Sequence, residues 1–280
     1  MIRQLLLLAA LCAVTFNALA DSPAGIEVRY LGNAGVLVRL GATKVLFDPL
    51  YRVSDERYQS VPERLENAVL RGEPPYDGVS AVFVSHVHHN HFSPGLVLDY
   101  LMIHPDVRLF APEQAIQTLR RFAGAGDEQS LERITAIDLA ADAPPAHYTL
   151  GPLAVTAVRI LHAEGERSYP DVQNLAYELT LAKVGTVIDL GDAAPRAKLF
   201  ERFAGQLRTA TEPVVLAPYW FFLEPEGRSI LERQLHAAEV LGLHVPVEIA
   251  GQGARRPRSL RAVDLFTQPG EKRDFDVVEE

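Results

Sequence analysis

The stretch VSAVFVSHVHHNHFSPG, residues 79–95, places four of the chain's nine histidines within six positions, directly after an apolar run. The β-branched and aromatic residues 79–84 predict a strand, and residues 93–95 carry the serine, proline and glycine that can start a helix. The histidines therefore lie on a strand-to-helix loop, where α/β sheets commonly bind ligands. His86 and His88, two apart in an extended segment, can share one metal ion. A solvated histidine-rich loop is the alternative.

Further metal-ligand candidates recur at the ends of other predicted strands. Asp48 follows the strand expected at 44–47, His162 follows 153–161, and Asp192 follows 186–190. Imidazoles and carboxylates are typical ligands of zinc in proteins. Their repeated position at strand ends favours one shared site over a chance cluster of histidines.

Strands and helices alternate along the rest of the chain, which predicts an α/β (α+β) fold with antiparallel hairpins at its start and middle. The remaining strands are expected at 26–31, 36–40, 107–110, 133–139, 175–181, 214–217 and 245–250, and the helices at 63–71, 95–103, 113–123 and 230–241. Residues 51–76 contain scattered charges and three prolines, which indicates an irregular insert that could act as a lid.

Composition and the N-terminus set the expected class and location of the protein. Residues 1–20 combine a basic start, an apolar run and an Ala-Leu-Ala step, which predicts a secretory signal peptide and a periplasmic or secreted protein without a stable membrane anchor after cleavage. The one cysteine lies in that segment, so the mature chain has no thiolate ligand. A net charge of −9 argues against nucleic acid as a partner. We expect one domain over 21–269 and a charged, frayed tail over 270–280.

The ordered series of motifs resembles the metallo-β-lactamase superfamily of hydrolases over nearly the whole mature chain. Residues 85–91, SHVHHNH, are similar to the pattern Ser/Thr-His-x-His-x-Asp-His; residues 30–35 and 46–49 resemble the opening strands and first acidic motif; residues 174–177 and 189–192 resemble the later strand pair and second acidic motif. The resemblance implies a four-layer αβ/βα sandwich, two mixed β-sheets flanked by helices.

The resemblance also implies roles for individual residues. His86, His88 and His162 would bind one ion, expected to be zinc, with manganese or iron as alternatives, and would leave a position for water. His91 would serve a second ion that Asp192 bridges to the first. Asp48 would orient a ligand histidine. The ion would lower the pKa of its bound water to about 7 and so supply a hydroxide nucleophile.

Two departures from the pattern leave open whether a second ion binds. The aspartate of the pattern is Asn90 here, which removes one negative charge from the site. The final histidine is expected after a Pro-x step, but Pro246-Val247 leads to Glu248. Glu248 can ligate zinc through a carboxylate oxygen, and His244 and His236 lie near enough in sequence to replace the missing histidine.

Other conspicuous residues have simpler interpretations. We expect His89, His104, His147 and His236 to be surface residues, and Asp171 to form a turn. The aromatic run 219–222, YWFF, predicts core, with an apolar substrate wall as the alternative.

The sequence thus predicts an exported metal-dependent hydrolase that uses zinc-bound hydroxide on an ester-, amide- or phosphoester-type bond of a small molecule. The alternative is a metal-binding or ligand-binding module that has the fold but lacks turnover, because Asn90 and the missing final histidine weaken the site. Neither the substrate nor the oligomeric state follows from the sequence.

Overall fold

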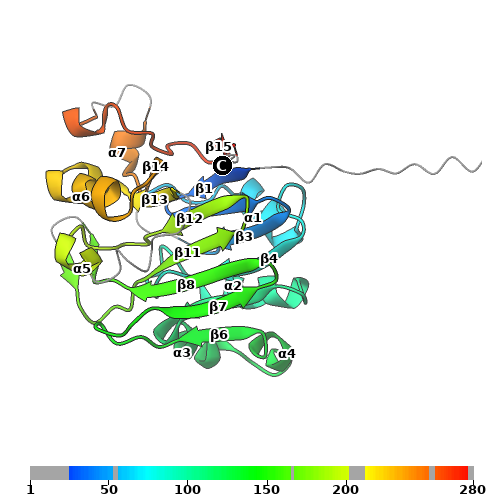
Figure 1. Cartoon of the computed structure of the whole chain (residues 1–280). Coiled ribbons are helices and arrows are strands. Elements are labelled where there is room, and N and C mark those ends of the chain that lie inside the picture. Colours follow the sequence, from blue (N-terminus) through cyan, green and yellow to red (C-terminus); the bar gives the residue numbers. More distant parts are fainter. Residues whose placement is uncertain (1–24, 53–55, 165–166, 202–211, 252–255, 277–280) are drawn as a thin grey trace, which may run out of the picture.

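Two mixed β-sheets pack face to face in the computed structural model, which describes residues 25–52, 56–164, 167–201, 212–251 and 256–276 (Figure 1). The first sheet has the order β15 (Lys272–Phe275), β1 (Ile26–Gly32), β2 (Gly35–Leu40), β3 (Thr43–Phe47), β4 (Val79–Phe83), β5 (Arg108–Pro112) and β6 (Ile134–Ile137). The second has the order β14 (Glu239–Leu243), β13 (Val214–Pro218), β12 (Gly185–Asp189), β11 (Leu175–Leu181), β8 (Leu153–Arg159) and β7 (Ala146–Leu150). A short ribbon pairs β9 (His162–Glu164) with β10 (Arg167–Tyr169).

Helices cover the outer faces of both sheets. The described helical elements are α1 (Glu63–Arg71), α2 (Pro94–Ile103), α3 (Glu113–Phe122), α4 (Glu128–Leu131), α5 (Ala197–Glu201), α6 (Pro225–Ser229), α7 (Val247–Ala250), the 3-10 turns η1 (Tyr219–Phe222) and η3 (Arg258–Leu260), and the π turn η2 (Ile230–Gln234). Helices α1 to α3 pack on the first sheet, whereas α5, η1 and η2 pack on the second. The predicted four-layer αβ/βα sandwich is confirmed.

An aromatic stack between the sheets joins the end of β4 to β11. The ring centroid of Phe83 lies 4.9 Å from that of Phe110, 5.2 Å from that of Phe47 and 5.0 Å from that of Tyr177. Tyr177 also donates its hydroxyl hydrogen to the carbonyl of Val84 over 3.0 Å. The burial of these rings fixes the start of the histidine loop against the second sheet.

Strand β4 lies between parallel neighbours β3 and β5, and it is buried along most of its length. Such a strand needs apolar residues on both faces, which explains the continuous run Val-Ser-Ala-Val-Phe. Parallel pairing brings the carboxyl ends of β3 and β4 to the same edge of the sheet. That edge carries the chain into Asp48 and into the histidine loop.

The C-terminal elements differ from the prediction. The expected helix 230–241 is a π turn followed by β14, and the expected strand 245–250 contains helix α7. Gly242, which directly follows the expected helix, lies inside β14, where an added Cβ atom would clash with the side chain of Leu265. A glycine at a close approach inside a strand looks the same in sequence as a helix terminator.

The charged tail expected from residue 270 is in part a strand. Residues Lys272–Phe275 pair antiparallel with β1 as β15, and Arg273 makes two bonds of 2.7 Å to the carboxylate of Asp264. Charged side chains are common on such edge strands because they oppose pairing with another chain. The expectation of a frayed end is therefore wrong for these four residues.

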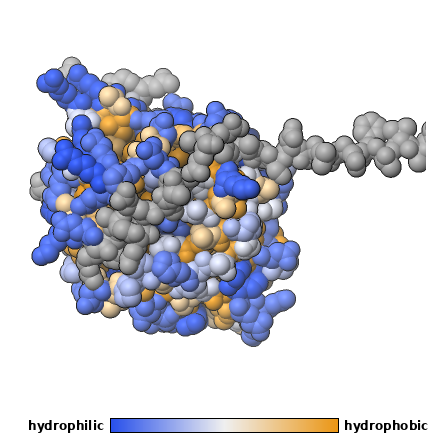
Figure 2. All heavy atoms as spheres, in the orientation of Figure 1, coloured by the Kyte–Doolittle hydropathy of each residue, from blue (hydrophilic) through white to orange (hydrophobic). Residues whose placement is uncertain are grey.

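No helix in the described part of the chain is long and apolar enough to span a bilayer. The predicted signal peptide, residues 1–20, lies outside the described residues. On the face drawn in Figure 2, hydrophilic residues surround smaller hydrophobic areas.

Glu178 on β11 is expected to make stability depend on pH. Its side chain is buried, its Oε2 has no hydrogen-bond partner among the described residues, and burial raises its pKa to about 7. The folded state therefore holds this proton more tightly than the unfolded state, so the contribution to stability is complete below pH 4.5 and is lost as the pH rises through about 7. We expect Glu178→Gln to raise the melting temperature at pH 8 by about 2–4 °C, which corresponds to about 1 kcal/mol in the free energy of unfolding. At pH 4.5 the melting temperature should be unchanged. Equal shifts at both pH values in thermal scans would contradict this assignment.

Candidate metal centre

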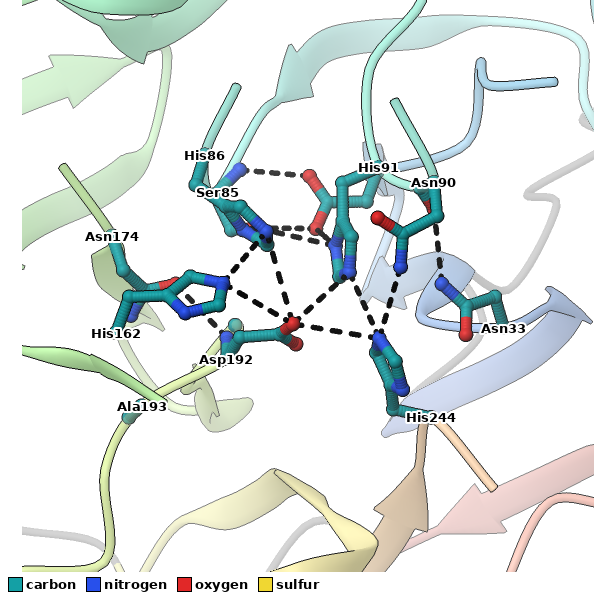
Figure 3. Close-up of polar contacts among 12 residues, drawn as sticks. Asn33, Ser85, His86, Asn90, His91, His162, Asn174, Asp192, Ala193 and His244 are labelled. Atoms are coloured by element: carbon teal, nitrogen blue, oxygen red, sulfur yellow. Dashed lines mark hydrogen bonds and ion pairs between the residues drawn. The ribbon is translucent and has the colours of Figure 1, made fainter. Parts of the chain in front are cut away.

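The site lies where strand ends of both sheets meet. Asp48 follows β3, and the histidine loop follows β4. In the second sheet, Asp192 follows β12 and His244 follows β14, while His162 begins β9 shortly after β8. Figure 3 shows the side chains of His86, His91, His162, Asp192 and His244 pointing toward one another. The structure thus brings together five elements that are far apart in sequence.

One group of donor atoms comes from His86, His88 and His162, and these atoms lie within 4.8 Å of one another. The Nε2 atoms of His86 and His162 are 3.1 Å apart. Ser85 Oγ lies 2.9 Å from His86 Nδ1, so the other ring nitrogen of His86 faces the group. His86 and His162 are buried, whereas His88 is half-buried.

A second group comes from His91, Asp192 and His244, all of them buried. The Nε2 atoms of His91 and His244 are 3.1 Å apart, and each lies 3.4 Å from Asp192 Oδ2. The same oxygen is 3.7 Å from His86 Nε2 and 3.5 Å from His162 Nε2. Asp192 Oδ2 therefore lies between the two groups, which is the position of a bridging ligand (Figure 3).

Asp48 lies behind the second group and uses both of its oxygens there. Oδ1 accepts the backbone N–H of Ser85 over 2.7 Å, and Oδ2 accepts the Ser85 hydroxyl. Oδ2 also lies 2.7 Å from His91 Nδ1, which leaves His91 Nε2 to face Asp192. Such a carboxylate fixes the tautomer of a ligand histidine.

We expect Asp48→Asn to weaken metal binding about 10–100-fold, because the amide nitrogen cannot accept the His91 proton. Asp171→Asn, the same change at an exposed aspartate, is the control. Competition against a chromophoric chelator measures both variants. Equal affinities would show that Asp48 does not orient His91.

Asn174 and Gly191 fix the loop that carries Asp192. Asn174 Oδ1 accepts the backbone N–H of Asp192 over 2.9 Å, and its amide nitrogen donates to the carbonyl of Leu190 over 3.2 Å. Gly191 has a φ of 52°, and a Cβ there would come within 2.5 Å of Asn174 Oδ1 and 2.7 Å of Ser85 Cβ. Only glycine lets this turn pass so close to the histidine loop.

The pKa shifts differ in direction among the residues of the cluster. Burial lowers the pKa of His86 well below its usual value, which favours the neutral imidazole that binds metals. Burial also opposes protonation of His91, but Asp192 and Asp48 outweigh it and raise its pKa to about 10. For Asp192, burial is outweighed by His244 and His91, which hold its pKa well below the usual range.

The donor set fits a metal ion. Two nitrogens on one tetrahedral zinc, each at about 2.0–2.1 Å, lie about 3.4 Å apart. The observed separations between nitrogens, 3.1 Å in both groups, are close to that value. Among the described residues, Asp192 Oδ1 is also buried without a hydrogen-bond partner, as an orphaned polar atom beside an ion would be.

Several residues predicted as ligands or alternatives lie elsewhere. Glu248 is exposed on α7 and is in neither donor group. His236 is exposed after the π turn, and His89 is exposed on the histidine loop. His244, left open by the sequence, takes the last position because β14 ends at Leu243, seven residues before the end of the strand expected at 245–250. Asn90 is half-buried, and its Nδ2 lies 3.2 Å from His244 Nε2.

Three residues that the sequence analysis did not identify as supports of the site contact its ligands: Asn33, Tyr58 and Trp220. Asn33 is fully buried at a φ of 45°; it donates from Nδ2 to the carbonyl of Asn90 and accepts the backbone N–H of His244, both over 2.9 Å. The Tyr58 and Trp220 rings lie 4.1 Å and 5.3 Å from the His244 ring. The turn sequence around Asn33 was a usable signal, because asparagine tolerates the left-handed region.

The aromatic run 219–222 belongs mainly to the core. Trp220, Phe221 and Phe222 are buried against the second sheet. Trp220 Nε1 also donates to the carbonyl of Ala193, beside Asp192, over 3.0 Å. Trp220 therefore links this core to the segment that carries Asp192.

Solved structures of metallohydrolases share this architecture. Igni18, a metallo hydrolase from the archaeon Ignicoccus hospitalis, superposes with a TM-score of 0.57 at 16% identity over 90% of this chain and 98% of its own. A possible metal-dependent hydrolase from Veillonella parvula gives 0.60 at 15% identity, over 90% of this chain and 100% of its own. The chain has the metallo-β-lactamase fold. An isothiocyanate hydrolase from Delia radicum gut bacteria gives 0.57 at 13% identity, over 90% and 100%. No protein-family model matches the sequence, and neither does any curated protein.

The metallo-β-lactamase fold explains why ligands separated by more than 150 residues converge. Its two sheets place their strand ends at one edge, and the donor atoms of this chain occupy that edge. The His/Asp cluster and the metallohydrolase neighbours together support a metal cofactor.

Proposed function

We propose that this chain is an exported metal-dependent hydrolase that binds two divalent ions, zinc in the first instance, and cleaves an ester-, amide- or phosphoester-type bond of a small molecule. The position of Asp192 Oδ2, 3.4–3.7 Å from four imidazole nitrogens in two donor groups, carries the proposal. An ion held there supplies Lewis-acid activation of water and of the scissile group.

The residues of the chain would each have a defined part. His86, His88 and His162 would hold one ion, and His91, His244 and Asp192 the other, with Asp192 shared between them. Asp48 and Ser85 keep the ring nitrogens aimed at the centre, so the ligands are oriented before an ion arrives. The partners that bury His91, His162, His244 and Asp192 exclude bulk water from one side. A substrate would approach from the side of the half-buried His88 and Asn90.

The proposal is tested by measuring the metal content and the rate of hydrolysis of three proteins: the wild type, His88→Ala and His89→Ala. The substrate panel should hold esters, amides, phosphodiesters and an isothiocyanate, the last because one neighbour of this fold is an isothiocyanate hydrolase. We expect His88→Ala to lose metal and activity, and the exposed neighbour His89→Ala to keep both. Equal activity in all three would refute the hydrolase. Bound metal without turnover on any substrate would favour the non-catalytic binding module.

Export has its own test. N-terminal sequencing of the protein recovered from the producing cell should begin after residue 20. An intact residue 1 in the mature protein would refute cleavage.

A further inference from the structure

The donor set of the second group carries little negative charge. His91 and His244 are neutral ligands in the metal-binding form, and Asp192 is the one anion in the group. Asn90, where the pattern of the superfamily has aspartate, reaches the group with an amide nitrogen 3.2 Å from His244 Nε2. The ligands of a second ion therefore hold one negative charge fewer than the pattern provides.

The surrounding carboxylates do not compensate for this. Two divalent ions bring four positive charges, whereas the buried carboxylates near them, Asp48, Asp189 and Asp192, offer at most three negative ones. Asp48 is already engaged by Ser85 and His91, and Asp189 accepts the N–H of Gly191 over 2.9 Å. A net positive charge enclosed by buried groups is costly, so an anion from solution that binds there lowers this cost.

The geometry also offers a place for such an anion. His88 and Asn90 are half-buried, while the other ligands are buried, so the cluster meets solvent on the side of these two residues. An oxyanion from solution could therefore reach the second ion from that side.

We propose that the substrate of this site carries an oxyanion, either a phosphate or a carboxylate group. Because Asn90 supplies no negative charge where the pattern has aspartate, the binding of this anion and the binding of the second divalent ion strengthen each other. The proposal rests on the proposed two-ion hydrolase. Because coupling is reciprocal, the anion raises the affinity for the ion as much as the ion raises the affinity for the anion.

The experiment is a Co²⁺ titration of the full chain, followed by visible absorption, with methylphosphonate, acetate or chloride at matched ionic strength. Chloride controls for screening, and the first two anions distinguish phosphate-type from carboxylate-type substrates. In the wild type we expect methylphosphonate or acetate to tighten the second Co²⁺ at least about tenfold over chloride and to leave the first nearly unchanged.

Two variants test the cause. Asn90→Asp supplies the missing charge, so its second Co²⁺ should bind tightly in chloride, with coupling reduced to less than about threefold. Asn90→Ala changes side-chain size but not charge, so its coupling should stay close to that of the wild type. Absence of coupling in the wild type, full coupling in Asn90→Asp, or lost coupling in Asn90→Ala would each overturn the proposal. If Asn90→Asp fails to fold, the titrations of the wild type and of Asn90→Ala still decide whether the proposal holds.

The outcomes separate this proposal from the hydrolase itself. A chain that binds no Co²⁺ refutes the metallohydrolase. A chain that binds two ions with equal affinity in all three anions keeps the metallohydrolase and refutes only the anionic substrate.

Discussion

Replacing Asp192 with asparagine is expected to abolish the binding of both ions and to lower activity by about 10³-fold or more, a loss of about 4 kcal/mol in transition-state stabilisation. Asp192 Oδ2 lies 3.4–3.7 Å from imidazole nitrogens of both donor groups. An amide oxygen has nearly the same shape but no charge, so the variant removes the anion that two dications would share. Metal stoichiometry after dialysis and kcat/KM measure the effect.

Asp189→Asn is the matched control for this prediction. Asp189 lies three residues earlier in the same segment, and burial, together with the charge of Asp48, raises its pKa to about 8. Its carboxyl is therefore largely protonated at pH 7, and asparagine can still accept the Gly191 N–H. We expect activity within about threefold of the wild type, since one neutral hydrogen-bonding group replaces another. Equal losses in both variants would show that Asp192 acts through the fold and not as a ligand.

His244→Ala and Glu248→Ala should have opposite outcomes. His244 Nε2 lies 3.1 Å from His91 Nε2 and 3.4 Å from Asp192 Oδ2, whereas Glu248 is exposed on α7. The first variant should bind one ion per chain in place of two and lose about 10²-fold or more in activity, because the second donor group is reduced to two residues. The second should keep both ions and full activity.

Elemental analysis and kcat/KM decide between these two residues. Loss of an ion in Glu248→Ala would mean that α7 rearranges to bring its carboxylate inward. Retention of both ions in His244→Ala would remove His244 from the ligand set. Circular dichroism checks that both variants keep the fold, which matters for His244→Ala because the His244 ring is buried against Tyr58 and Trp220.

The sequence by itself determined most of the candidate centre. His86, His88, His91, His162, Asp48 and Asp192 each lie in the segment that follows an apolar strand, and the structure brings all six together. Strand composition and the residues just beyond it are local properties. For that reason a motif at a strand end can be recognised without knowledge of its partners.

Only the tertiary structure decided the last ligand and its supports. Whether Glu248 or His244 faces Asp192 depends on where β14 ends, and that is set by its parallel pairing with β13 and by the close approach of Leu265 to Gly242. Asn33 likewise joins Asn90 to His244, which lie 154 residues apart in sequence. Long-range packing overrides the helical periodicity of residues 230–241, because burial against β13 outweighs a local preference worth less than about 1 kcal/mol per residue.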